Sequence, residues 1–160
     1  MTGLQTVERS DTISLAALTE EVFCDLDPVA EKHQVRLIQT DGDCTVTGSY
    51  ILLYRAVYNL VENAIKYNRP SGSVTVSIHT AESAVLEVTD TGIGISPENQ
   101  EKIFDPFYRV DKSRSRAMGG AGLGLALVSE IARQHNGQVK VTQSSEKGST
   151  IALMLPVTLL

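Results

Sequence analysis

The chain has few cysteines and no long apolar run, and both shortages narrow what it can be. Cys24 and Cys44 lie in unrelated contexts within the 160 residues. A disulfide scaffold and a cysteine zinc site are therefore not expected. We expect the chain to lie in a reducing compartment. Every apolar run is far shorter than the ~18 residues that a membrane span needs. Residues 1–4 are neither a signal peptide nor a membrane segment, so we expect a soluble, cytoplasmic chain.

An excess of positive charge is also absent. The formal net charge is -5, which argues against nucleic acid as a partner. Hydrophobic residues make up 42% and charged residues 21% of the chain, and both values are ordinary for a globular protein. The length fits one domain with a sizeable core.

The sequence shows no nucleophile–base set. His33, His79 and His135 are scattered along the chain, and we expect them to be ordinary surface or partly buried residues. The Asp and Glu residues have no metal-ligand spacing. Function must therefore be sought in other residue types.

Periodicity predicts about three main helices. Residues 1–12 are polar without a period, so they are expected to be a tail or linker, with the domain covering residues 13–160. The first helix is predicted over 14–33, where Pro28 is expected to kink or split it. A second helix follows Ser49, a plausible N-cap, and ends at residues 68–72. A third covers 123–135 and ends at Asn136-Gly137.

Alternating residues predict six short strands in three hairpins. Residues 35–39 and 44–47 are expected to pair through Asp41-Gly42-Asp43, which is typical hairpin chemistry. Residues 74–79 pair with 84–88, and 139–142 with 150–155. A short helix is expected between Ser96 and Phe104. Strands in hairpins with helices on one face predict an α+β fold, a two-layer α/β sandwich.

The second helix has an unusual polar face. Its apolar residues form one stripe, made of Leu53, Val57, Leu60, Val61 and Ala64. The opposite side carries Asn59, Asn63, Lys66 and Tyr67, with Glu62 on its flank. Asn is a poor helix former, so two Asn at i and i+4 indicate a task that offsets the lost propensity. The alternative is a solvated face with two indifferent amides.

Two glycine-rich segments can bring backbone close to a ligand. Asp90-Thr91-Gly92-Ile93-Gly94 follows a predicted strand, where a carboxylate can accept a hydrogen bond from an exocyclic amine. Its alternative role is a tight turn. Residues 120–124, Gly-Ala-Gly-Leu-Gly, precede a helix whose N–H groups can hold phosphates, or they form a flexible hinge. Leu125 replaces the lysine of a P-loop, and no strand precedes the segment as a dinucleotide fingerprint requires.

Residues 105–120 have no regular period, and such long segments are usually functional lids.

Four motifs occur in order along the chain: Asn59-x-x-x-Asn63-x-x-Lys66-Tyr67, Asp90-x-Gly92-x-Gly94, residues 104–109 (Phe-Asp-Pro-Phe-Tyr-Arg) and residues 120–125. Together they resemble the catalytic, ATP-binding domain of a two-component sensor histidine kinase over about residues 13–157. The resemblance implies the Bergerat fold, a mixed and mostly antiparallel sheet packed against about three helices, and it implies ATP and Mg²⁺.

The resemblance also implies roles for single residues. Asn63 matches the Mg²⁺ ligand, and Asn59 matches a partner on the phosphate and metal side. Lys66 and Arg109 match phosphate-contacting residues. The implied catalytic set is Asn59, Lys66 and Arg109. Asp90 matches the residue that reads the adenine amine. The other positions implied to contact ATP are Tyr67, Gly92, Gly94, Ile95, Phe104, Gly120, Gly122, Leu123, Gly124, Leu125 and Ser149, with Phe104 and Phe107 as lid anchors. Ser149 stands where relatives often have threonine, and Ala121 replaces another frequent threonine.

The resemblance separates kinases from hydrolases at Asn59. Hydrolysing relatives carry Glu there as the general base, and an amide cannot take a proton at neutral pH. We therefore expect ATP to be held without brisk hydrolysis until another nucleophile arrives.

The expected phosphoacceptor is missing. None of the three histidines precedes an acidic residue, and the tail before Ser14 is too short for a helical hairpin. The resemblance therefore implies a protein-histidine kinase domain that acts on a histidine-bearing dimerisation domain of the same kinase, with relay to a response regulator. The whole protein is expected to be a membrane-anchored homodimer with this part in the cytoplasm. The alternatives are a stand-alone serine kinase of the anti-sigma-factor type and a nucleotide-binding module without activity.

Overall fold

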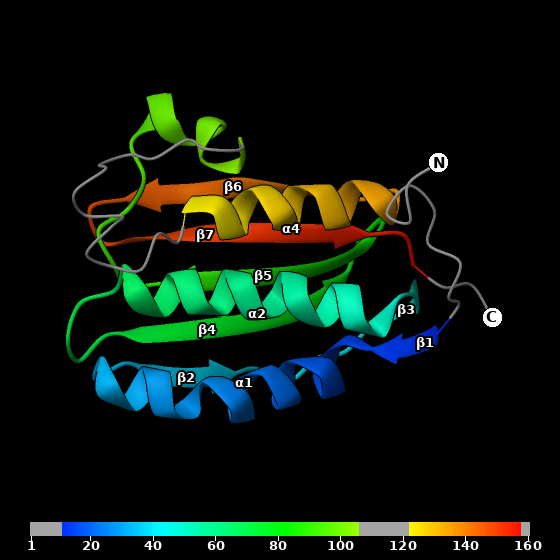
Figure 1. Ribbon diagram of the computed structural model, residues 1–160, viewed down its shortest axis with the longest axis horizontal. Coiled ribbons are helices and arrows are strands. Elements are labelled where there is room, and N and C mark those ends of the chain that lie inside the picture. The colour runs from blue at the N-terminus through cyan, green and yellow to red at the C-terminus, as the bar shows by residue number, and fades with distance from the viewer. Residues whose placement is uncertain (1–10, 106–121, 158–160) are drawn as a thin grey trace.

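A computed structural model describes residues 11–105 and 122–157, without the side chain of Leu123. The described residues form a sheet with three α-helices side by side on one of its faces, and Figure 1 shows these two layers. The helices are α1 (Leu15–Lys32), α2 (Tyr50–Lys66) and α4 (Gly122–Gln134). The strands are β1 (Asp11–Ser14), β2 (Arg36–Gln39), β3 (Thr45–Gly48), β4 (Ser73–Thr80), β5 (Ala84–Asp90), β6 (Gln138–Ser145) and β7 (Gly148–Leu155). The predicted α+β sandwich is confirmed.

The main sheet is mixed and mostly antiparallel, as expected. Its five strands have the order β2-β4-β5-β7-β6, and only the pair β2–β4 is parallel. The two predicted hairpins β4–β5 and β6–β7 are confirmed. Both are local pairs with short turns, which sequence patterns describe well.

The predicted hairpin of residues 35–39 and 44–47 is wrong. β2 pairs with β4, and β3 instead pairs with β1 in a separate two-stranded sheet, where Asp11 lies opposite Gly48. Asp11 and Thr12, expected in the tail, thus belong to a strand. The side chain of Asp43 explains why residues 35–39 and 44–47 do not form a hairpin. Its carboxylate accepts hydrogen bonds from Ser14 Oγ (2.8 Å), Ala16 N (2.9 Å) and Cys44 N (2.7 Å), so it caps the start of α1 rather than closing a turn.

Helix α2 starts at its predicted capping residue. Ser49 is the N-cap of α2 and accepts a hydrogen bond from Leu52 N at 3.3 Å. Pro28 does not split α1, which continues to Lys32. Pro28 has no N–H to donate to the backbone carbonyl of Cys24, one turn earlier. Both residues are exposed, so water can hydrate that carbonyl instead. Among the described residues, no helix has the length and apolar character that would let it cross a membrane.

Helix α2 is the centre of the core. It lies between α1 and α4 over the sheet (Figure 1). The predicted apolar stripe is buried throughout, at Leu53, Val57, Leu60, Val61 and Ala64. Helix α2 therefore has a fixed orientation, and its polar residues have fixed positions around it.

The Asp43 cap gives a testable stability effect. Partial burial acts to raise the pKa of the Asp43 carboxyl, but hydrogen bonds from Ala16 N, Ser14 Oγ and Cys44 N outweigh it, so the pKa is lowered. A lowered folded-state pKa stabilises the protein above the unfolded pKa, and that stabilisation is lost as the pH falls through the folded pKa.

We expect Asp43→Ala to reduce the free energy of unfolding by roughly 1–2 kcal/mol at pH 7, the cost of a lost helix cap. The difference from the wild type should shrink below about pH 4. Urea unfolding at several pH values measures it, with the exposed Asp41→Ala as the control. A difference that does not change with pH would contradict the capping role of the ionised carboxylate.

Candidate functional site

The two amides on the polar face of α2 are buried. Asn59 and Asn63 are only 8% and 7% exposed. Asn59 Nδ2 donates to the carbonyl oxygen of Gly124 in α4 at 3.3 Å, and Asn63 Nδ2 donates to the carbonyl oxygen of Asn59 at 3.0 Å. A Cβ at Gly124 would lie 3.5 Å from Asn59 Nδ2, so α4 passes close to the amides. The alternative of a solvated face with indifferent amides is wrong.

Asn63 Oδ1 is a buried acceptor without a partner. It is inaccessible to solvent, and no described residue donates a hydrogen bond to it. An unpartnered buried polar atom costs about 1–3 kcal/mol, and a ligand that bonds to Asn63 Oδ1 would offset that cost. The described residues contain no group of three or more His, Cys, Asp or Glu side chains that could hold a metal alone. One or two amide oxygens completed by a substrate's phosphates suit Mg²⁺, so the residues present fit this ion.

The last turn of α2 carries Lys66 and Tyr67. Lys66 Nζ lies 3.7 Å from Glu62 Oε2, and both side chains are partly exposed. Tyr67 is the C-cap residue, and its N–H donates to the carbonyl oxygen of Asn63. The Tyr67 carbonyl oxygen touches the backbone at Gly92, where any Cβ would clash with it. Glycine at position 92 thus lets the end of α2 meet the end of β5.

Asp90 ends β5 with its side chain held by β7. Its Oδ1 accepts hydrogen bonds from Gly92 N (2.8 Å) and Ser149 N (3.3 Å), and its Oδ2 accepts one from Ser149 Oγ (3.0 Å). Burial raises the pKa of the Asp90 carboxyl, and the hydrogen bonds from Gly92 and Ser149 offset this only in part. Asp90 and Ser149 are directly opposed in the β5–β7 ladder, so the two predicted residues lie together.

The residues after Asp90 are fixed against β6. Gly94 has φ +77°, and its Cα faces the Ser145 carbonyl, so a side chain there would be strained and would clash. Ile95 N donates to Ser144 Oγ at 2.6 Å. The helix expected between Ser96 and Phe104 consists of two short 3-10 turns, Pro97–Asn99 and Lys102–Phe104. Ile95 and Phe104 are half-buried against the core.

The described site residues gather at one end of the molecule. In Figure 1 the C-terminal end of α2, the first turn of α4, the end of β5 and the start of β7 lie at the same side. Leu125 is buried and belongs to the core. Gly122 is the first residue of α4. Arg109, Phe107, Gly120 and the side chain of Leu123 lie outside the described residues, as does most of the predicted lid.

Sequence reasoning missed several polar residues that support this end. Ser144, Asn68 and Thr91 hold the segment after β5 through hydrogen bonds. The sequence analysis used Asn68 only to mark the end of a helix. Its position directly after the motif Asn63-x-x-Lys66-Tyr67 could have indicated a role at the site.

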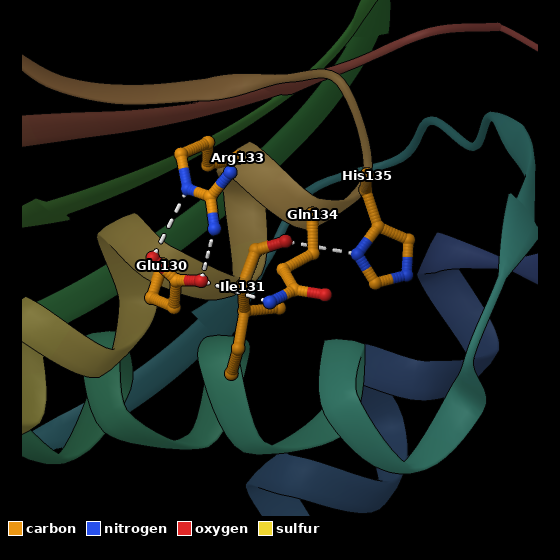
Figure 2. A network of polar contacts seen from close by, with 5 residues as sticks. All are labelled: Glu130, Ile131, Arg133, Gln134 and His135. Carbon is orange, nitrogen blue, oxygen red and sulfur yellow. Dashed lines mark hydrogen bonds and ion pairs between the residues drawn. The ribbon is translucent and has the colours of Figure 1, made fainter. Parts of the chain in front are cut away.

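The three histidines were expected to be surface or partly buried, yet His135 is buried. Figure 2 shows its Nδ1 beside the carbonyl oxygen of Ile131, at 2.9 Å. Its Nε2 accepts a hydrogen bond from Ser49 N at 3.1 Å, so Nδ1 carries the proton and donates. His135 therefore joins the end of α4 to the start of α2, at the opposite end of α4 from Gly124.

Comparison with known proteins identifies the family. The family model for histidine kinase-, DNA gyrase B- and HSP90-like ATPases matches residues 48–159. The chain belongs to this ATPase family. The predicted resemblance is thereby confirmed at the level of the fold and the family.

Proteins similar to this chain include several sensor histidine kinases. SenX3 of Mycobacterium tuberculosis is 46% identical over 123 residues, covering 74% of this chain and 30% of SenX3. CusS of Escherichia coli is 35% identical over 153 residues, covering 95% of this chain and 32% of CusS. The mycobacterial sensor histidine kinase MprB has a solved structure with a TM-score of 0.79 and 27% identity, covering 94% of this chain and 99% of that one. This chain spans about a third of the length of the curated relatives.

The half-buried Asp90 carboxylate should affect stability with the opposite sign to Asp43. Because its folded-state pKa is raised, the unliganded protein should lose stability as the pH rises from the unfolded to the folded pKa. An amide at position 90 can keep the same acceptor oxygen without the charge.

We expect Asp90→Asn without nucleotide to be at least as stable as the wild type at pH 7, with the advantage disappearing near pH 4. Urea unfolding from pH 4 to pH 8 measures this, with the exposed Asp41→Asn as the matched control. A variant that is clearly less stable than the wild type at pH 7 would show that the ionised carboxylate supports the fold.

Proposed function

We propose that this chain is the catalytic domain of a sensor histidine kinase, which binds Mg²⁺-ATP and transfers the γ-phosphoryl group to a histidine on a separate dimerisation domain. One observation carries the proposal. On the polar face of α2 the amides of Asn59 and Asn63 are buried, and Asn63 Oδ1 has no hydrogen-bond partner among the described residues. A buried pair of amides with a free oxygen is poorly suited to folding alone and well suited to a phosphate-bound cation.

The adenine base would lie against Asp90. A carboxylate has about four lone-pair directions, and three of those of Asp90 accept hydrogen bonds from Gly92 and Ser149. The remaining lone pair can accept a hydrogen bond from the exocyclic amine of adenine. Because neither Gly92 nor Gly94 has a side chain, the base can approach the backbone closely. The name of the family, an ATPase family, supports ATP as the nucleotide.

The phosphates would lie along the polar face of α2. The amide oxygens of Asn63 and Asn59 would hold Mg²⁺, which neutralises phosphate charge when bound. Lys66 Nζ, now beside Glu62, is partly exposed and can turn toward a phosphate. Arg109 and Gly120 are proposed as further phosphate contacts.

The amide at position 59 favours a kinase over a hydrolase. The amide of Asn59 cannot take a proton from water, and the carboxylate of Glu62 on the flank of this face is paired with Lys66. ATP would therefore persist until a histidine ring nitrogen attacks. A bond then forms between that nitrogen and the γ-phosphorus, the bond to the bridging oxygen breaks, and ADP leaves with the electron pair.

The partners follow from the relatives. Similar proteins are named as sensor histidine kinases, which favours a histidine acceptor over the serine acceptor of the anti-sigma-factor type. The rest of the protein would supply the dimerisation domain, and a response-regulator aspartate would receive the phosphoryl group. The proposed setting is the cytoplasmic part of a membrane-anchored homodimer.

The acceptor is tested by phosphotransfer. The chain is mixed with γ-labelled ATP and the dimerisation domain of the same protein, and we expect acid-labile, base-stable label on that partner. An acid-stable label would favour the serine kinase, and unlabelled partner with intact ATP binding would favour a module without activity.

The metal role of Asn63 is tested by Asn63→Ala. Loss of an oxygen that binds the ion directly should reduce Mg²⁺-dependent phosphotransfer by about 100-fold or more, because loss of groups that only support metal ligands already costs 10- to 100-fold in metal affinity. Gln143→Ala, which removes an exposed amide on β6, is the control. Phosphotransfer near the wild-type rate at limiting Mg²⁺ would contradict the assignment.

The adenine role of Asp90 is tested by Asp90→Asn. Loss of a charge-assisted hydrogen bond should weaken ATP binding by roughly 10- to 100-fold, while the unliganded variant stays folded. Calorimetric titration measures the affinity. An unchanged dissociation constant would remove Asp90 from the adenine site.

A further inference from the structure

The Thr91 hydroxyl stands where three segments of the chain meet. It donates to Asn68 Oδ1 at 2.9 Å and accepts from Ser73 N at 2.9 Å. Asn68 Nδ2 in turn donates to the carbonyl oxygen of Ser73 at 2.8 Å. The end of α2, the start of β4 and the residue after β5 are thereby joined in one closed hydrogen-bonded ring, which we call the Thr91 junction (Thr91, Asn68 and Ser73).

The backbone around the Thr91 junction has little room to move. Any Cβ at Gly72 would clash with Asn68 Oδ1 and lie 2.5 Å from Thr91 Oγ1. Any Cβ at Gly148 would clash with the Asp90 carbonyl oxygen and lie 2.9 Å from Thr91 Cα. Thr91 is thus held on one side by the loop before β4 and on the other by the turn before β7.

The junction bears directly on the orientation of the Asp90 carboxylate. Thr91 links Asp90 to Gly92, and Gly92 N donates to Asp90 Oδ1 at 2.8 Å. The dihedral angles at Thr91 therefore decide where that N–H points. If the hydroxyl bonds are lost, the N–H and the carboxylate that it orients gain freedom, and ordering them again on binding costs affinity.

We propose that Thr91, supported by Asn68, is a positioning residue for adenine recognition that acts through Asp90. This inference rests on the proposed nucleotide site and deepens it. The hydroxyl does not touch the base; it fixes the carboxylate that does. The side chain is exposed, so its polarity serves no need of the core.

The test compares variants that differ by one hydroxyl. Thr91→Val should weaken ATP binding roughly 3- to 10-fold, the value of one net hydrogen bond, and Thr91→Ser should restore it. Thr89→Val is the matched control, because Thr89 lies two residues earlier and its hydroxyl bonds to Thr150 Oγ1 at 2.9 Å, away from the junction. Calorimetry gives the dissociation constants, and thermal unfolding confirms that each variant is folded.

A second nucleotide separates positioning from a general loss of structure. Purine riboside triphosphate lacks the exocyclic amine, so it cannot donate to Asp90. Thr91→Val should leave its affinity nearly unchanged while weakening ATP. Equal weakening of both nucleotides, or no weakening of either, would overturn the inference. If Thr91→Val does not fold, Asn68→Ala removes the acceptor of the same bond and should give the same ATP-selective loss. A wild type that binds neither nucleotide would refute the proposed function itself, and this inference with it.

Discussion

Helix α2 lies between α1 and α4 on the sheet, so two of its faces are buried at once (Figure 1). The first face is apolar and its burial drives folding. The second carries Asn59 and Asn63, whose amide hydrogens are satisfied by backbone carbonyls. Asn63 Oδ1 has no such partner among the described residues. The fold thus holds a polar acceptor in place at a cost in stability, and the other site residues are arranged around that end of the helix.

Glycines join the separate parts of this end without side chains in between. Gly92 lets the Tyr67 carbonyl reach the segment after β5, and Gly72 and Gly148 let the backbone approach Thr91 closely. Asp90 is charged at a half-buried position, and this burial raises its pKa. Such a group weakens the unliganded fold, and it becomes useful only when a donor from a ligand completes its hydrogen bonds. Stability is lower where the proposed nucleotide would bind, as expected for a binding site.

Local patterns in the sequence were sufficient for much of the fold. The apolar stripe of α2, the Ser49 cap and the hairpins β4–β5 and β6–β7 depend on neighbours in the chain, and each was predicted. The pairing of β2 with β4 and the use of Asp43 as a cap for α1 depend on contacts across 27 or more residues, so local turn chemistry gave the wrong hairpin. The burial of Asn59 and Asn63 depends on how α4 packs. The motifs located those residues, but only the packing shows that Asn63 Oδ1 lacks a partner.

The central claim is that Asn63 holds a cation bound to the nucleotide. Paramagnetic Mn²⁺, which accepts the same oxygen ligands as Mg²⁺, tests it directly in the NMR spectrum of the chain with ATP. At low Mn²⁺, the side-chain amide resonances of Asn63 and Asn59 should broaden before that of Asn136 beyond the far end of α4, and they should not do so without ATP. If the Asn63 resonance stays sharp while amides elsewhere broaden first, the cation lies in another place and the account is wrong.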